Sequence, residues 1–499
     1  MTLHPWPLGI VDNMTLGGLL VSMITLGVWA GRHRVTTRDF FLGGRKIPAW
    51  AVCLSMIATE VSALTLVGVP ATAFRENWEY AQFFIGSFAA RVAIAYWFIP
   101  IFYAYNCTTI YEFLKHRFGP ATQYTASVFF FITRLIGSGI RLMAGSLAIS
   151  VILDLPIELV IGFFILFGVA YIVYGGIKAV IWTGVFQGLI FVAAGGVTIA
   201  YLILHIQGGW TTFHLVATQA GKLKLWDWGP SLHQPHFAHA FFSDPNIVWI
   251  AILNGFFGSL AAFGTDQELM QRLLTIETRQ KSQRTMVAAP FASFAVLLIY
   301  LTIGTGLFVY YHQFPATALP QKLDKIFPFF IKNVLPAGLR GFVFSAILMA
   351  TLDSPLMSLS ASFITDIYKP LLQKDRSDAH YLVISRVSVV VFALLLAGIA
   401  YASSFYNDIL WLAFKIGGVT FGSLLGVFLL GIFTKRRSNY GNVIGMVTMM
   451  VVNGTLLTLS ELKIVPIGWT WLVLIGTAGT FAIGWFLGPY LEQGNEVPL

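Results

Sequence analysis

The stretch IATEVSALTLVGVP (residues 57–70) decides the fold, because polar and helix-breaking residues interrupt an otherwise apolar segment. Glu60 and Ser62 would lie near the middle of a membrane span, and Gly68 and Pro70 follow them. Irregular backbone is tolerated at membrane depth only where it lines a cavity or is buried in protein. The stretch therefore predicts a broken helix at a transport site.

A second stretch, NGFFGSLAAFGTDQ (254–267), lies five apolar spans further along the chain and contains Gly255, Gly258 and Gly264. Interrupted helices at corresponding positions of two halves indicate a midplane site between structural repeats. We expect this span to be interrupted too, although glycine in apolar spans also serves close helix packing.

Composition places the whole chain in the membrane. Hydrophobic residues make up 57% of the 499 residues, charged residues 11%, and the mean hydropathy is +0.76. Soluble domains carry about 25% charged residues, so an all-α, polytopic membrane protein in contact with a lipid bilayer is expected. Thirteen stretches are long enough to cross the bilayer: 9–30, 48–72, 81–105, 124–153, 156–175, 180–205, 246–270, 286–311, 341–368, 380–403, 409–433, 438–460 and 467–490.

The net charge of +9 is better explained by membrane topology than by nucleic-acid binding. With the N-terminus outside, the inward connections hold eighteen Lys and Arg residues and the outward connections hold eight. The positive-inside rule thus predicts an outer N-terminus and an inner C-terminus. Cys53 and Cys107 face no oxidising compartment in this topology, so no disulfide is expected.

Arg134 and Arg141 lie seven residues apart inside one predicted span, which puts both guanidinium groups on one helix face. A charge at the bilayer centre costs about 2.5–3.5 kcal/mol, so carboxylate partners or an anionic solute must offset it. The other charges in or near the membrane are Arg91 and Lys415, with Glu60, Asp353 and Asp266 as the anions.

Six ordered motifs resemble the sodium/solute symporters, the family of bacterial proline, sugar and sialic acid carriers and of animal sodium–glucose cotransporters. They cover most of the chain: RDFFLGGRKIPAW (38–50), TIYEFLKHRFG (109–119), YGGIKAVIWTGVFQG (174–188), GTDQELMQRLL (264–274), LDSPLMSLSASFITDIY (352–368) and LLGVFLLGIFTKR (424–436). The resemblance implies a five-plus-five inverted repeat with one extra N-terminal and two extra C-terminal helices.

The resemblance divides the chain into five parts. These are an extra helix and inner loop (1–47), a first repeat (48–205), an outer loop (206–245), a second repeat (246–433) and two C-terminal helices with a tail (434–499). It also implies a multi-pass protein of the bacterial cytoplasmic membrane.

The family's main sodium site, carried over by position, takes backbone oxygens from Ala58, Val61 and Ile347. Its two hydroxyl positions fall on Ala350 and Thr351, and Ala350 offers no side-chain oxygen. Hard oxygen ligands suit a hard cation, and a helix break frees carbonyls for this purpose.

A second ion site departs from the family pattern as well. Gly184 stands where members often carry an aspartate, and Asp353 and Ser354 stand where hydroxyls are usual. Either the site is rebuilt around Asp353, or a single ion is coupled, or Asp353 pairs with a membrane arginine.

The solute positions follow from the same comparison and from the charge inventory. An arginine of the sialic acid carriers would align near Gly137, one turn from both Arg134 and Arg141, so we expect an anionic solute such as sialic acid or another carboxylate. A neutral sugar, proton coupling through Glu60, or a sodium-independent carrier or sensor remain alternatives. The candidate solute residues are Glu60, Ser62, Thr65, Arg91, Arg134, Arg141 and Lys415.

Lys415 has a second interpretation, in which it reaches the outer interface instead of the solute. Asp266, Gln267 and Arg272 are expected at the inner mouth as gate or structural ion-pair residues. We find no nucleophile–base pair, metal motif or nucleotide loop, so an enzyme is not expected. Sodium is the one ion or cofactor that the resemblance implies.

Overall fold

The computed structural model describes residues 8–32, 36–231, 233, 237–315, 319–352, 355–406 and 409–492, and every regular element among them is a helix. The longer helices are α1 (Ile10–Ala30), α3 (Ala49–Glu60), α4 (Ala63–Arg75), α5 (Phe83–Ala93), α8 (Pro120–Leu153), α9 (Ile157–His205), α10 (Gly209–Gln219), α12 (Val248–Gly264), α14 (Arg279–Gln313), α16 (Leu339–Leu352), α18 (Asp378–Ser403), α19 (Ile409–Phe433), α20 (Asn439–Glu461) and α21 (Leu472–Leu491). Shorter helices connect them: α2 (Thr37–Leu42), α6 (Ile99–Ala104), α7 (Tyr111–Arg117), α11 (Phe237–Ser243), α13 (Gln267–Leu274), α15 (Ile326–Asn333) and α17 (Leu356–Ser362).

The thirteen predicted spans all correspond to helices. Eleven described segments are long and apolar enough to cross a membrane, and each coincides with a predicted span. The other two predictions fall on the broken pair α3–α4 and on the first part of α9, which divides at Gly176 (φ 54°, ψ −161°). The predicted membrane architecture is thus confirmed.

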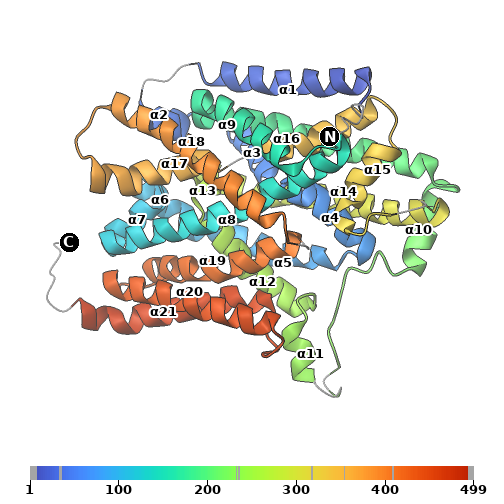
Figure 1. The fold of residues 1–499 in the computed structure, drawn as a ribbon. Coiled ribbons are helices and arrows are strands. Elements are labelled where there is room, and N and C mark those ends of the chain that lie inside the picture. Colours follow the sequence, from blue (N-terminus) through green and yellow to red (C-terminus); the bar gives the residue numbers. More distant parts are fainter. Residues whose placement is uncertain are drawn as a thin grey trace.

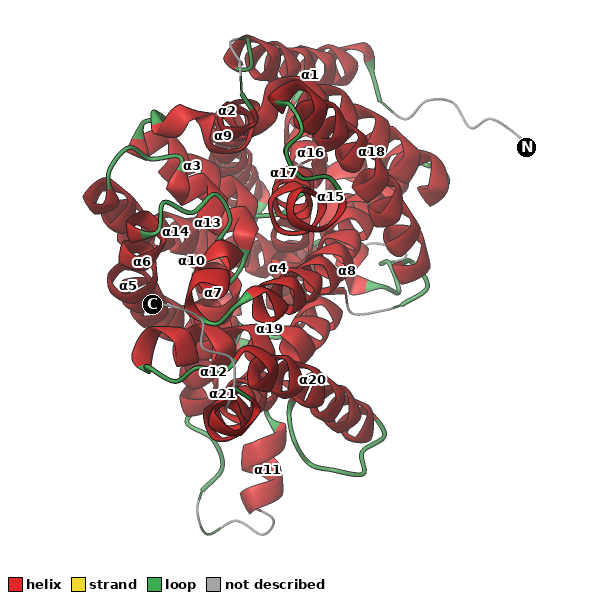
Figure 2. Ribbon diagram, turned by 90° about the vertical axis from the view of Figure 1, so that its left-hand side faces the viewer, coloured by secondary structure: helices red, strands yellow, loops and turns green. Residues whose placement is uncertain are grey.

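The helices run roughly side by side, with α1 along one edge and α19, α20 and α21 stacked along the opposite edge (Figure 1). Helices α7 and α2 lie toward one end of the bundle, and α10 and α15 lie toward the other. Figure 2 looks along the bundle onto the end that carries α7. In the predicted topology the α7 end faces inward and the α15 end faces outward.

The second span is broken where the sequence predicts. Helix α3 ends at Glu60 and α4 begins at Ala63, with Ser62 extended between them (φ −82°, ψ 175°). The Val61 amide donates to the Ile57 carbonyl at 2.8 Å, and helical bonding restarts from the Ser62 carbonyl, which accepts from the Leu66 amide at 3.1 Å. The break leaves carbonyl groups at membrane depth that are not used by a continuous helix.

The interruption expected in the seventh span occurs at only one of its three glycines. Helix α12 continues through Gly255 and Gly258, so the expectation is wrong there, but it ends at Gly264, and α13 begins at Gln267. A Cβ atom on Gly255 would lie 2.1 Å from the Phe83 carbonyl oxygen, and one on Gly86 would lie 1.9 Å from the Ile252 carbonyl oxygen. Gly255 therefore allows α5 and α12 to pack with their backbones nearly in contact.

The extra N-terminal helix is tied to the start of α16 by one carboxylate. Asp12 is fully buried and accepts hydrogen bonds from the amides of Gly338 (2.8 Å) and Gly341 (2.9 Å). Its Oδ2 atom also lies 2.9 Å from Nε and 2.5 Å from Nη2 of Arg340. A carboxylate at a helix N-terminus satisfies amides that have no partner within the helix, so α1 holds α16 in place.

Candidate ion and solute site

The candidate sodium residues come from the break between α3 and α4 and from α16, which packs against α4. Ala58, Val61, Ile347 and Ala350 are all buried. Within the described part of the chain, the carbonyl oxygens of Ala58 and Val61 accept no recorded backbone hydrogen bond. They are suitable oxygen ligands for a hard cation.

The α16 side of this candidate site offers one hydroxyl. Thr351 Oγ1 donates to the Ile347 carbonyl at 2.8 Å. A cation bound by both oxygens would therefore have to replace this hydrogen bond. Gly145 of α8 leaves the room for this side chain, since a Cβ atom there would lie 1.8 Å from Thr351 Oγ1. Ala350 adds no side-chain oxygen, and Asp353 and Ser354 lie outside the described residues.

The α9 position of the second ion site is closed by packing. A Cβ atom on Gly184 would lie 2.5 Å from Ser55 Oγ. Ser55 Oγ in turn accepts from Arg272 Nη1 at 2.6 Å. An ion site that includes α9 would therefore need ligands other than a side chain at residue 184.

Glu60 and Arg91 are paired with each other. Arg91 Nη1 lies 2.9 Å from Glu60 Oε1, and Ser293 Oγ donates to Glu60 Oε2 at 2.6 Å. The Arg91 guanidinium also lies over the Phe263 ring, 3.3 Å from its centroid. These contacts join the end of α3 to α5 and α14, and solute binding by Glu60 and Arg91 stays a prediction that would require this pair to part.

Arg134 also has carboxylate partners, and they lie at the inner end of the molecule. Its Nη1 atom is 3.5 Å from Asp266 Oδ2, and its Nη2 atom contacts Glu268 Oε2. Glu268 reaches Arg272 as well, with 3.7 Å between Oε1 and Nη2. This buried network joins α8 to α13, and solute binding by Arg134 stays a prediction that would require these pairs to part.

Gln267 extends the inner network to the loop before α7. Its Oε1 atom accepts from the Ile110 amide at 3.0 Å, and its Nε2 atom donates to the Thr108 carbonyl at 3.1 Å. Asp266, Gln267 and Arg272 thus take part in contacts that close the inner side. Glu268 was missed from sequence, although its spacing of four from Arg272 is that of a helical ion pair.

Arg141 lies on the same face of α8 but farther from the inner network. It is half-buried, and the residues around it on this face are Ser138, one turn before it, and Gly145, one turn after it. Gly145 contacts Thr351, so Arg141 lies beside the candidate sodium site. Ser138 Oγ is buried and has no hydrogen-bond partner among the described residues, and no sequence pattern indicated it.

Two hydroxyls of the broken span lie near this face, since α4 packs against both α8 and α16. Ser62 is buried, and its side chain makes no capping bond to α4. Thr65 Oγ1 donates to the Glu60 carbonyl at 3.4 Å. The two hydroxyls thus belong to a helix that packs against the helix of Arg141.

Lys415 is not part of this arrangement. Its Nζ atom lies 2.7 Å from Glu461 Oε1, at the end of α20, and the two side chains are 28% and 53% exposed. This position agrees with the alternative in which the lysine reaches the outer interface.

An aromatic cluster joins α5, α19 and the turn before α21. Tyr80 lies 6.3 Å from Phe414, Phe414 stacks on Trp469 at 5.6 Å, and Trp469 stacks on Phe83 at 6.5 Å, all between ring centroids. These rings connect the start of α5 with α19 and with the turn before α21.

Comparison with known proteins gives one consistent family. The profile described as "Sodium:solute symporter family" matches residues 40–448. The sodium/sialic acid symporter SiaT of Proteus mirabilis is 28% identical over 467 residues, which cover 90% of this chain and 90% of that protein. The human sodium-coupled monocarboxylate transporter 1 is 29% identical over 455 residues, or 89% of this chain and 72% of that protein.

A solved structure agrees with the fold over almost the whole chain. It is that of a Na+-coupled sialic acid symporter in a substrate-bound, outward-open state, with a TM-score of 0.84 and 25% sequence identity. The match covers 97% of this chain and 98% of the solved one.

Proposed function

The chain belongs to the sodium:solute symporter family and is a sodium-coupled, multi-pass membrane transporter, and we propose that its solute is a small organic carboxylate such as sialic acid. The observation that carries this proposal is the position of Arg141 on α8, beside Ser138 and next to the Thr351 contact. A guanidinium binds a carboxylate through two parallel hydrogen bonds. The names of the sialic acid and monocarboxylate relatives support the same solute class.

The other membrane charges contact carboxylates. Arg91 neutralises Glu60, and Arg134 contacts Glu268 and Asp266. Both oxygens of Glu60 are engaged, by Arg91 and by Ser293. In this proposal Glu60 is therefore a structural residue and not a proton carrier, and sodium is the coupling ion.

The proposed cycle uses the helix break between α3 and α4 and the ion pairs between α8 and α13. Sodium held by the carbonyls of Ala58, Val61 and Ile347 and by Thr351 would fix the broken span against α16 and complete the solute site. Release on the inner side would then require α13 to part from α8, and so would break the contacts of Arg134 with Glu268 and Asp266. We place the N-terminus outside and the C-terminus inside a bacterial cytoplasmic membrane, on the distribution of Lys and Arg.

A thermal-unfolding screen tests the solute class. Purified protein is heated with sialic acid, lactate or glucose, each in sodium and in choline. A ligand that binds only the folded state stabilises it by about 2.7 kcal/mol at 100 times its dissociation constant. We expect a carboxylate to raise the Tm in sodium and much less in choline. Stabilisation by glucose alone would instead support a neutral sugar as the solute.

A further inference from the structure

Asp366 is a fully buried carboxylate in the π-helix Phe363–Leu372, which follows α17. Its Oδ1 atom accepts from Thr109 Oγ1 at 2.7 Å and from Gln123 Nε2 at 2.8 Å, and its Oδ2 atom accepts from Ser362 Oγ at 2.7 Å. All three donors are neutral. Among the described residues, no lysine, arginine or histidine forms an ion pair with Asp366. A buried charge without a partner of opposite sign is costly, so this carboxyl group is suited to exist in a neutral form as well.

The amide group of Gln123 provides a hydrogen bond for that neutral form. Gln123 is 2% exposed, and its Oε1 atom is buried without a hydrogen-bond partner in the described part of the chain. A half-turn of the amide exchanges Oε1 and Nε2, and so places an acceptor where the donor now lies. A protonated Asp366 would then donate to Gln123 Oε1. The same side chains can therefore hold the carboxyl group with or without its proton.

Asp366 holds the same loop as the inner network. Thr109 lies in the loop before α7, and its two neighbours in sequence bind the Gln267 side chain of α13 through their backbone groups. The loop is therefore held by α13 on one side and by Asp366 on the other. Hydrogen bonds to a charged acceptor are about twice as strong as those between neutral groups. Protonation of Asp366 would thus weaken the attachment of this loop and of the start of α8 to the π-helix.

Other titratable groups at this end of the molecule determine the controls. The π-helix packs against α8, α18 and α17, and α17 carries no titratable side chain. At this end of α8 and α18, on the π-helix and on α7 with its preceding loop, the titratable or charged groups are Cys107, Tyr111, Glu112, Lys115, His116, Arg117, Tyr124, Tyr368, Lys369, Asp378, His380 and Tyr381. Glu112 Oε2 accepts from the Thr109 amide at 3.1 Å, so a second carboxylate binds this loop. Histidine is the side chain that ordinarily changes charge near neutral pH. His116 is exposed, and His380 Nε2 lies 2.9 Å from Tyr368 Oη.

We propose that Asp366 and Gln123 form a proton-binding site, and that a proton taken up from the inner side favours opening of that side. A hydronium ion in the inner water gives its proton to a carboxylate oxygen of Asp366 and leaves as water, and the reverse transfer restores the charge. Because the carboxylate is fully buried, this exchange requires the loop before α7 to move, which links protonation to opening. Sodium stays the coupling ion, and the inference depends neither on the solute nor on the sodium ligands.

Hydrogen exchange of the loop before α7 tests the site without any solute. The full-length protein in nanodiscs is followed by mass spectrometry from about pH 5 to about pH 9. Exchange of the peptide 105–112 is divided by that of an unstructured reference peptide, which cancels the pH dependence of the exchange chemistry. Asp366→Asn carries no charge at any pH and so resembles the protonated form. We expect the wild-type loop to exchange about fivefold more slowly than that of Asp366→Asn at high pH, and at nearly the same rate at low pH.

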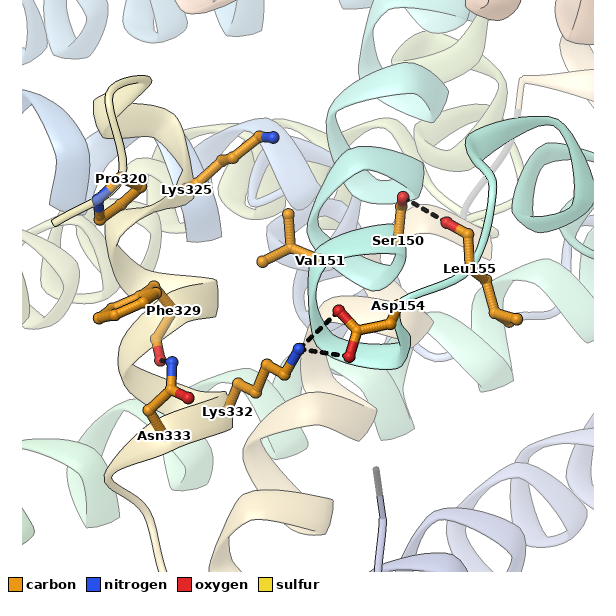
Figure 3. Close-up of a pocket in the computed structure, with 9 residues that line it drawn as sticks. All are labelled: Ser150, Val151, Asp154, Leu155, Pro320, Lys325, Phe329, Lys332 and Asn333. Atoms are coloured by element: carbon orange, nitrogen blue, oxygen red, sulfur yellow. Dashed lines mark hydrogen bonds and ion pairs between the residues drawn. The ribbon is translucent and has the colours of Figure 1, made fainter. Parts of the chain in front are cut away.

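Three further variants make the test specific. His380→Gln removes the nearby histidine of α18 and should keep the wild-type pH profile. Asp154→Asn should keep it too, because Asp154 is an exposed carboxylate at the other end of α8, with Lys332 Nζ 2.6 Å from both of its oxygens (Figure 3). Ser362→Ala removes one donor to the charged form and should move the midpoint of the profile upward by about one pH unit. This shift tests the site even where Asp366→Asn fails to fold.

A constant ratio between the wild type and Asp366→Asn over the whole pH range would overturn the proton site and leave Asp366 as a structural carboxylate. Loss of the pH profile in His380→Gln would assign the titration to the histidine, and an unchanged midpoint in Ser362→Ala would equally contradict the proposal. Failure of the proposed function has a different signature, because no carboxylate would then be taken up in a sodium gradient while the pH profile of the loop would persist.

Discussion

Three arginines in the membrane core are chemically alike but have different surroundings. Arg91 is buried against Glu60 and the Phe263 ring, and Arg134 is buried against Glu268. Arg141 is half-buried beside Ser138, on the part of α8 that contacts α16. Breaking a buried ion pair costs about 3–5 kcal/mol, so Arg91 and Arg134 are poorly suited to exchange their partners for a solute. We base the proposed assignment of the solute carboxylate to Arg141 on its position beside Ser138 and one turn from the Thr351 contact.

Replacing Arg141 with Gln should abolish most transport of a carboxylate. Loss of a desolvated, charge-assisted contact costs about 2 kcal/mol or more, which corresponds to about a 30-fold fall in kcat/KM. The kcat/KM of Arg141→Lys should lie between those of the wild type and Arg141→Gln, because lysine keeps the charge but not the paired hydrogen bonds. The matched control is Arg386→Gln, an exposed arginine on α18. If Arg141→Gln transports as well as the control, the assignment is wrong.

We expect the ion stoichiometry to depend on Asp353. Ser55 occupies the space beside Gly184, so a second ion would have to rely on α16 and the residues that follow it. We expect Asp353→Asn to raise the sodium concentration needed for half-maximal uptake and to lower the steepness of sodium activation. Asp375→Asn, an exposed residue, serves as the control. Unchanged sodium activation in Asp353→Asn would favour a single ion, with Asp353 as a structural residue.

At the scale of helices, we propose that the ion pairs between α8 and α13 close the inner side. Cys107 offers a native reporter, because it is 1% exposed and precedes Thr108, whose carbonyl accepts from Gln267. Burial, together with the nearby Glu112 carboxylate, raises the pKa of Cys107 to about 12. The thiol therefore stays neutral at pH 7 and reacts slowly while the inner side is closed.

Glu268→Gln should make the Cys107 thiol more accessible to a thiol reagent. In a Cys53→Ser background, we expect maleimide labelling of Cys107 to rise about tenfold or more, since a shift of 1.4 kcal/mol already changes a two-state population tenfold. Sodium should reduce the labelling by favouring the state with a closed inner side. Glu277→Gln, which removes an exposed ion pair with Lys281, is the control. Equal labelling of Glu268→Gln and this control would show that the pair is not a gate.

The link between α1 and α16 makes a further prediction at this scale. Asp12→Asn removes the charge that accepts two amide bonds and the Arg340 contact, each of which stabilises by about 1.5–3 kcal/mol when charged. We expect a lower Tm in detergent and weaker sodium activation, because α16 carries Ile347 and Thr351. Asp154→Asn, which breaks an exposed pair with Lys332, should change sodium activation little. A normal sodium response in Asp12→Asn would limit α1 to a purely structural role.

The helices could be predicted from sequence where neighbouring residues alone determine the structure. The spans follow from apolar runs, and the break at Val61 and Ser62 follows from polar residues in such a run. The interruption expected at Gly255 failed because a glycine that frees the backbone and a glycine that admits a neighbouring helix look the same in sequence. Only the position of α5 against α12 distinguishes them.

The sequence also does not determine which charged residues of the site pair with each other. Arg134 and Arg141 share a helix face, and which of them meets Glu268 depends on how α8 and α13 are aligned, which no periodicity encodes. Glu60 and Arg91 are 31 residues apart, so their pairing was one option among several. The assignments of individual residues to sodium and solute stay predictions, whereas the family and its sodium-coupled transport are established.

The fold combines an aromatic cluster, a broken span and a buried ion-pair network in one bundle, with α1 on one edge and α19 to α21 on the other (Figure 1). In an alternating-access transporter the outer and inner closures open in turn while the site between them stays assembled. Solute movement should therefore depend on the sodium gradient and not only on the solute gradient. This dependence is the central claim for the molecule as a whole.

The most direct test is accumulation of sialic acid in proteoliposomes that contain the purified protein. We predict uptake above the external concentration when sodium is high outside and low inside, and rapid loss of the accumulated solute when an ionophore dissipates the sodium gradient. Choline in place of sodium should reduce uptake to the level of empty vesicles. Uptake that is equal in choline, or no accumulation of any tested carboxylate alongside accumulation of glucose, would contradict the account.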